Sequence, residues 1–129
     1  MQKNFIVIAA LLAAAAVMLG AFGAHGLKAK LTPDQLQVFE TGVKYQFYHA
    51  LGLFLLGLLM FQHHSNPLLV YAGYAFMAGI LLFSGSLYLL ANKTLLGIEG
   101  WRWLGPVTPL GGLSFIAGWL LLAAGVWRN

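Results

Sequence analysis

The sequence contains no cysteine and only three acidic residues, Asp34, Glu40 and Glu99. Without cysteine there are no disulfides, no thiolate catalysis and no cysteine-based metal sites. None of the three acids lies in a long apolar segment, so an intramembrane acid pair for catalysis or proton transfer is excluded. Nothing else resembles a nucleophile with a base and an orienting acid, and Ser84-Gly85-Ser86 is more typical of helix packing than of a nucleophile. We therefore expect a protein that is not an enzyme.

Long uncharged segments make up most of the chain. They cover residues 5–24, 45–61, 68–91 and 106–127. A hydrocarbon core of ~30 Å needs roughly 20 helical residues, and a backbone in lipid must satisfy its own hydrogen bonds. The sequence therefore predicts an all-α membrane protein in which residues 1–129 form one compact bundle of four transmembrane helices. Lys3 and the first segment also resemble a secretory signal, but its length and the three following spans favour a retained helix.

The basic residues predict the orientation of the helices in the membrane. The net charge is +4, and the basic residues are scattered near the ends of the apolar segments, which argues against nucleic-acid binding. The first and third loops, residues 25–44 and 92–105, carry five of the seven: Lys28, Lys30, Lys44, Lys93 and Arg102. The positive-inside rule then places these loops in the cytoplasm and both termini outside, with the second loop, residues 62–67.

Residues 33–44 are predicted to form an amphipathic helix before the second span. Thr32 is suited to cap it, Pro33 to occupy its first position and Gln35 to complete a capping box. Apolar residues recur along one side at spacings of three and four. Because this apolar side needs cover, we expect a bend near Gly42 that lays the segment along the lipid headgroups, in preference to a helix that projects from the membrane.

Small residues recur on single faces of three spans. Such faces let membrane helices approach closely, and they predict where the helices associate. The predicted packing positions are Ala13, Gly20, Gly79, Gly111, Gly118 and Gly125.

Several polar side chains lie within or beside the apolar segments and form a candidate intramembrane site. Its residues are His25, Gln46, Tyr48, His49, Ser84, Ser86, Tyr88 and Thr108. His25 and His49 are both predicted near the cytoplasmic boundary, where they could meet. Two facing histidines would suit a haem or metal site or a proton relay. The favoured interpretation is that each ring makes a hydrogen bond that fixes helix packing. Thr108 could also cap the start of the fourth helix. His63 and His64 in the second loop are only a weak metal signal.

Four short sequence segments resemble those of one protein family. They are Gly20-Ala21-Phe22-Gly23-Ala24-His25-Gly26-Leu27, Tyr45-Gln46-Phe47-Tyr48-His49-Ala50, Leu82-Phe83-Ser84-Gly85-Ser86-Leu87-Tyr88 and Thr108-Pro109-Leu110-Gly111-Gly112. In order and spacing they are similar to the YgdD/YwdK family of small bacterial inner-membrane proteins, a domain-of-unknown-function family. The resemblance implies a four-span protein of the plasma membrane and supplies no activity.

Two functions of different classes fit these observations. The first is a non-enzymatic scaffold that binds a second copy of itself or another membrane protein through its small-residue faces. The second is a small transporter or carrier of a ligand such as haem or lipid, built around His25 and His49. Water-filled transporters usually carry charge within their spans, and these spans carry none, which favours the scaffold. We expect no cofactor, no metal and no partner beyond the lipid bilayer and other membrane proteins.

Overall fold

The computed structural model describes residues 1–64 and 66–128, and within these residues it contains helices and no strand. Ser65, in the predicted second loop, lies outside the described residues. Four helical rods are long and apolar enough to cross a membrane: Gln2–Leu27, Pro33–Met60, Pro67–Ala91 and Leu104–Trp127. At 24 to 28 residues they are about 36–42 Å long, more than the ~30 Å hydrocarbon core requires. The four predicted spans are thus confirmed, each as part of a longer helix.

Two of the rods contain a wider π-helical turn. The first rod is α1 (Gln2–Phe22) followed by η1 (Gly23–Leu27), and the third is α3 (Pro67–Gly79), η2 (Ile80–Ser84) and α4 (Gly85–Ala91). The second rod is the single helix α2 (Pro33–Met60), and the fourth is α6 (Leu104–Trp127), preceded by the short helix α5 (Lys93–Leu96).

Local sequence signals fix where several helices start and end. The predicted capping box of α2 is present: Gln35 N–H donates to Thr32 Oγ1 at 3.2 Å, and Thr32 N–H donates to Gln35 Oε1 at 3.0 Å. Asn66 caps α3 with Pro67 at its first position, and α5 ends at Gly97, whose φ of 69° suits glycine. The prediction that Thr108 caps the fourth helix is wrong, because α6 already begins at Leu104.

The expected bend at Gly42 is absent, since α2 runs unbroken through it. The apolar side of residues 33–44 is covered by protein and needs no lipid headgroups. Phe39 is buried with Leu27, Leu31 and Ala91, and Leu36 and Val43 pack against this cluster. Residues 33–44 therefore pack against the first loop and the end of α4, and they continue without a bend into the second span.

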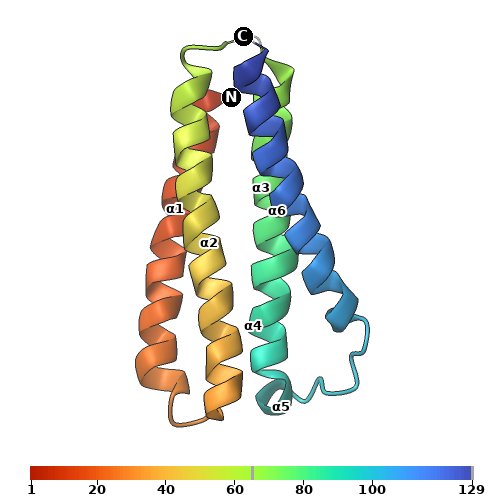
Figure 1. Ribbon diagram of the computed structural model, residues 1–129. Coiled ribbons are helices and arrows are strands. Elements are labelled where there is room, and N and C mark those ends of the chain that lie inside the picture. Colours follow the sequence, from red (N-terminus) through yellow and green to blue (C-terminus); the bar gives the residue numbers. More distant parts are fainter. Residues whose placement is uncertain (65, 129) are drawn as a thin grey trace.

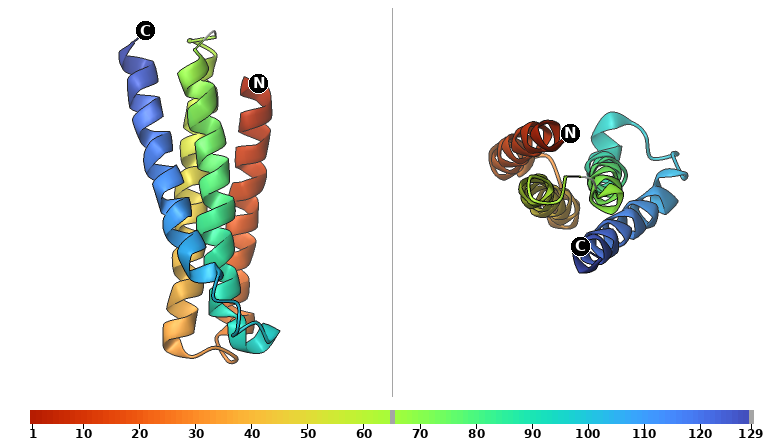
Figure 2. Two further views of the ribbon diagram at one scale, coloured as in Figure 1. Left: turned by 90° about the vertical axis from the view of Figure 1, so that its right-hand side faces the viewer. Right: turned by 90° about the horizontal axis from the view of Figure 1, so that it is seen from above.

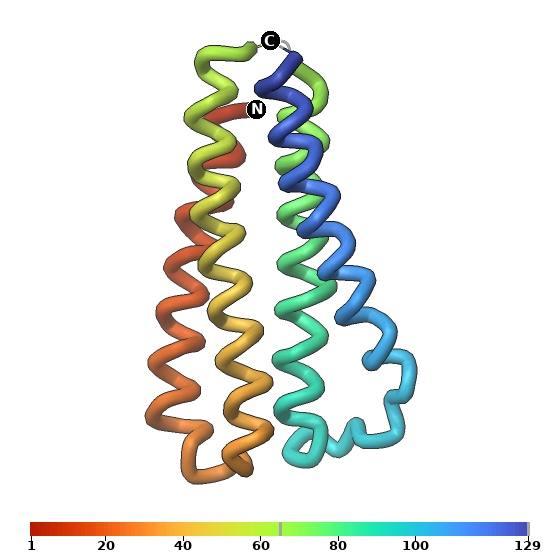
Figure 3. Tube along the Cα trace, viewed as in Figure 1, coloured from red at the N-terminus to blue at the C-terminus, as the bar shows by residue number. Residues whose placement is uncertain are grey.

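The rods form two antiparallel hairpins with α2 and the α3–α4 rod at the centre (Figure 1). α1 packs along α2, and α6 packs along α3 and η2 (Figure 2). Both termini lie at the end where α2 turns into α3, while the first loop and α5 lie at the opposite end (Figure 3).

The core is apolar, and so is much of the outside. Phe5, Leu53, Leu56, Leu69 and Phe76 are essentially fully buried where α1, α2 and α3 meet. The outer faces of the flanking helices α1 and α6 expose large apolar side chains, among them Leu11, Met18, Leu113 and Leu120. An apolar exterior on helices of this length is the arrangement that a bilayer requires.

Candidate functional site

His49 lies inside the bundle on α2 with only 5% of its surface exposed. Its Nε2 is 3.0 Å from Trp119 Nε1 of α6, and its Nδ1 is 2.8 Å from the Tyr45 carbonyl oxygen. An indole N–H can only donate, so Nε2 accepts and Nδ1 carries the proton that it donates to the Tyr45 carbonyl. This assigns a neutral ring with a defined tautomer, and both nitrogens are already bonded to protein.

Aromatic rings surround the His49 imidazole. The Phe115 ring stacks on it with centroids 3.6 Å apart and planes 11° from parallel. Phe76 meets it edge-on at 5.6 Å, and Tyr45 lies on its own helix at 6.1 Å. The arrangement joins α2, α3 and α6 through one side chain and leaves His49 nitrogens no open coordination position.

Gln46, one turn before His49, connects three helices. Its Nε2 donates to the Leu12 carbonyl of α1 at 2.8 Å, and its Oε1 accepts the Tyr88 hydroxyl proton of α4 at 2.6 Å. Gln46 is 4% exposed, and Tyr88 is half-buried. A buried amide with partners on both ends stabilises the packing and does not present a free polar group.

The serines of the third rod bond to its neighbours. Ser84 Oγ donates to the Gly42 carbonyl of α2 at 2.7 Å. Ser86 Oγ is 2.9 Å from the Phe83 carbonyl and 2.5 Å from Thr108 Oγ1 of α6. Six of the eight candidate residues therefore lie in interhelical hydrogen bonds: Gln46, His49, Ser84, Ser86, Tyr88 and Thr108.

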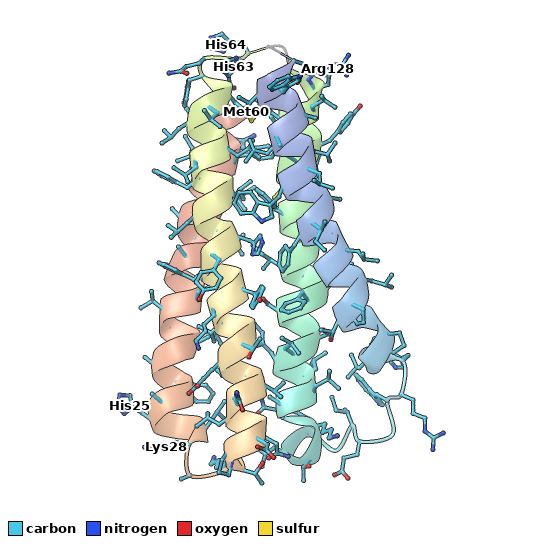
Figure 4. The ribbon with its side chains drawn as sticks, viewed as in Figure 1. His25, Lys28, Met60, His63, His64 and Arg128 are labelled. Carbon is cyan, nitrogen blue, oxygen red and sulfur yellow. The ribbon has the colours of Figure 1, made fainter. Side chains whose placement is uncertain are left out.

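The other two candidates, His25 and Tyr48, lie elsewhere. His25 is exposed in η1 and points away from the bundle (Figure 4), so the suggested meeting with His49 does not occur. The physical reason is that α2 starts at Pro33, which carries His49 about 24 Å along the helix axis at ~1.5 Å per residue. Tyr48 is 54% exposed, because it is one residue, or about 100°, away from the face that carries His49.

The predicted packing glycines mark close helix contacts within the chain. A Cβ on Gly111 would meet the Phe83 backbone, and one on Gly125 would meet Leu69. The rings of Phe115 and Phe76 fill the spaces over Gly79 and Gly118, respectively. Gly20 faces Val43, and Ala13 is half-buried on α1.

Some contributors were not found from the sequence. Trp119 was missed. Its indole N–H can only donate, and the residue follows the Gly118 packing position, so the sequence does indicate that it needs an acceptor on a neighbouring helix. Asn66 was missed although Asn-Pro is a helix-start signal. Its Nδ2 donates to the Gly125 carbonyl at 2.8 Å. Ser114 Oγ likewise donates to the Ala75 carbonyl at 2.7 Å.

No metal-binding constellation is formed by residues 1–64 and 66–128: no group of three or more histidine or acidic side chains is close enough to hold an ion. His63 and His64 lie at the same end of the molecule as Arg128 (Figure 4). His64 Nδ1 is 3.1 Å from the Gln2 amide nitrogen. Throughout this described part, every buried side-chain nitrogen and oxygen also has a hydrogen-bond partner.

Comparison with known proteins identifies the family. Residues 19–112 match the model of a family described as a protein of unknown function, DUF423. The chain is 48% identical over 121 residues to the UPF0382 membrane protein YwdK of Bacillus subtilis, covering 94% of each chain. It is 43% identical over 127 residues to the UPF0382 membrane protein SH2409 of Staphylococcus haemolyticus, covering 98% of each. No solved structure matches the chain significantly. These relatives are membrane proteins, as the four apolar helices require, and the chain belongs to this DUF423/UPF0382 family of membrane proteins of unknown function.

Proposed function

We propose that this chain is a non-enzymatic scaffold or interaction protein of the bacterial plasma membrane. The observation that carries the proposal is the pairing of its intramembrane polar groups with one another. His49 with Trp119, Gln46 with Tyr88, and Ser84 with Gly42 tie the rods into one fixed unit. A transporter or an enzyme needs polar groups that are available to a substrate, and paired groups are not.

The carrier hypothesis receives less support from the same geometry. It depends on His25 and His49 facing one space, and His25 lies outside the bundle (Figure 4). Haem ligation by His49 would require Nε2 to exchange Trp119 for iron inside a stack of aromatic rings.

The glycine faces of α3 and α6 are occupied within the chain, so partners would bind elsewhere. The exposed outer faces of α1 and α6 are the surfaces left for a second copy or another membrane protein. Leu11 is 66% and Leu113 is 62% exposed there. We place the first loop and α5 in the cytoplasm, since Lys28, Lys30, Lys93 and Arg102 gather at that end.

Site-specific photocrosslinking in living cells tests the proposal. A photoreactive residue at Leu11 or Leu113 should give a discrete protein adduct, at twice the chain mass if the partner is a second copy. The matched control is Leu95, which is also exposed but lies on α5 outside the spans. If neither Leu11 nor Leu113 gives a protein adduct, the proposal is overturned. A haem or metal bound stoichiometrically to the purified protein and lost in His49→Leu would favour the carrier.

A further inference from the structure

A groove runs between α1 and α2 on the outside of the bundle. Its volume is about 330 Å³, within the range of small-molecule sites. It exists because α1 carries small residues where it faces this side of α2. Apart from Lys44 and the Tyr48 hydroxyl its walls are apolar, and its lining is Ala16, Val17, Gly20, Ala21, Val43, Lys44, Phe47 and Tyr48.

The charged side chain of Lys44 is exposed next to the apolar surface of the first span. It lies eleven residues after Pro33, about 16 Å along the axis of α2. The adjacent first rod carries no charge from Phe5 to Ala24. This uncharged stretch extends beyond the level of the groove, since Gly20 faces Val43 and Gly23 faces Phe39. An ammonium at such a position is costly unless its stem extends to a headgroup or an anion comes to it.

The protein itself does not neutralise this charge. In the ranges that the structure describes, the Lys44 side chain makes neither a hydrogen bond nor an ion pair. Glu40 is exposed one turn away on the same helix, and no ion pair joins the two side chains. Lys28 lies in the adjoining loop (Figure 4), and Lys30 follows it in the sequence. With Lys44, the basic residues of this part of the chain outnumber the acidic Asp34 and Glu40.

A second groove, at the start of α2, serves as a contrast. It is of similar volume, about 340 Å³, but its lining includes Asp34 as well as Lys93. Opposite charges on its rim give it no preference for an anion. The α1/α2 groove combines an apolar channel with a single cation, which complements a molecule with an acyl chain and a negative headgroup.

We propose that the α1/α2 groove binds an anionic phospholipid, with one acyl chain along Ala16, Gly20 and Ala21 and the phosphate against the Lys44 ammonium. The site is independent of the scaffold function. An attraction of the size usual for a lysine at an anionic membrane surface corresponds to about a fivefold change in affinity.

Native mass spectrometry of the full-length protein tests the site by titration with phosphatidylglycerol and with phosphatidylcholine of the same chains. Lys44→Gln should weaken phosphatidylglycerol binding about fivefold, whereas Lys44→Arg should preserve it. The matched control Lys28→Gln removes the same charge from the loop outside the groove and should change binding less than about twofold. Ala21→Trp fills the groove and should reduce binding of both lipids. Its control Met18→Trp, on an exposed part of α1 that does not line the groove, should not.

The outcomes separate the explanations. Equal losses for Lys44→Gln and Lys28→Gln would show general surface electrostatics and overturn the site. Equal binding of the two lipids by the wild type would overturn its anionic character. If an Ala21→Trp variant folds and still binds both lipids fully, the lipid acyl chain does not lie in this groove, and the proposal is overturned.

Discussion

At the scale of single residues, the bundle is joined by side chains that donate to backbone carbonyls of neighbouring helices. Ser84 donates to Gly42, Ser114 to Ala75 and Gln46 to Leu12. A helical carbonyl has a second lone pair, so it can accept such a bond without losing its own helical partner. These bonds satisfy polar groups that would be costly in lipid and also fix the register of each helix against its neighbour.

The His49–Trp119 pair gives the prediction at this scale. His49→Leu leaves the buried indole N–H of Trp119 without its acceptor and removes the second bond to the Tyr45 carbonyl. The free energy of unfolding should fall by about 1–3 kcal/mol. His49→Gln keeps an acceptor and a donor and should cost less. In a double-mutant cycle with Trp119→Phe, we expect a coupling energy of about 0.6–1.7 kcal/mol, measured by unfolding in detergent.

The exposed Tyr48 supplies the control for this cycle. Tyr48→Phe should change stability by less than about 0.5 kcal/mol. Strictly additive effects of His49→Leu and Trp119→Phe would contradict the bond between them. A Soret absorption in the wild-type protein that disappears in both His49 variants would identify His49 as a haem ligand.

At the scale of elements, α6 is held against the third rod by its glycine line. Gly111, Gly118 and Gly125 recur every seven residues and each faces a side chain or the backbone of that rod. The closest approach is at Gly111, which lies against the Phe83 backbone in the π-helical turn η2. A backbone neighbour cannot rotate away, so this contact tolerates a Cβ less than the contacts with side chains do.

Adjacent glycines allow a matched test of this contact. A Cβ on Gly111 would lie 2.7 Å from Phe83 Cα, whereas on Gly112 the nearest atom would be Phe83 Cδ2 at 3.8 Å. Gly111→Ala should therefore lower the free energy of unfolding by about 1–3 kcal/mol through overpacking. Gly112→Ala should be neutral or stabilise by up to ~1 kcal/mol, because alanine restricts the unfolded chain.

Thermal unfolding of the two variants in one detergent makes the comparison. Equal stability of Gly111→Ala and Gly112→Ala would show that the backbones are not in contact at Gly111.

At the scale of the whole molecule, charge is distributed unequally between the two ends. The first loop and α5 lie together at one end, and both termini and the turn before α3 lie at the other (Figure 3). Because basic residues concentrate at the first of these ends, the positive-inside rule predicts that this end faces the cytoplasm.

Cysteine labelling tests this orientation without background, since the chain has no cysteine. Gln62 and Thr94 are exposed residues at opposite ends of the molecule. An impermeant thiol reagent applied to intact cells should label Gln62→Cys and should reach Thr94→Cys only after the membrane is opened. The reverse pattern would place both termini in the cytoplasm.

The sequence by itself determined the elements. Uncharged segments of roughly 20 residues specified four spans, because a backbone in lipid can satisfy its hydrogen bonds only within a helix. The Thr32–Gln35 capping box fixed the start of α2, since capping depends on residues a few positions apart. The lines of small residues identified the helix faces that pack, because a 3.6-residue period places them on one side.

Tertiary structure decided which faces meet and at what height. The sequence suggested that His25 and His49 could meet near the cytoplasmic boundary, because the second span was predicted to begin at residue 45. The second helix instead begins at Pro33, and this separates the two residues. The cover over Phe39 comes from Leu27 and Ala91, and the partner of His49 is Trp119, 70 residues away. Such pairings depend on how helices that are distant in the sequence align in space. A local period or spacing in the sequence contains no information about that alignment.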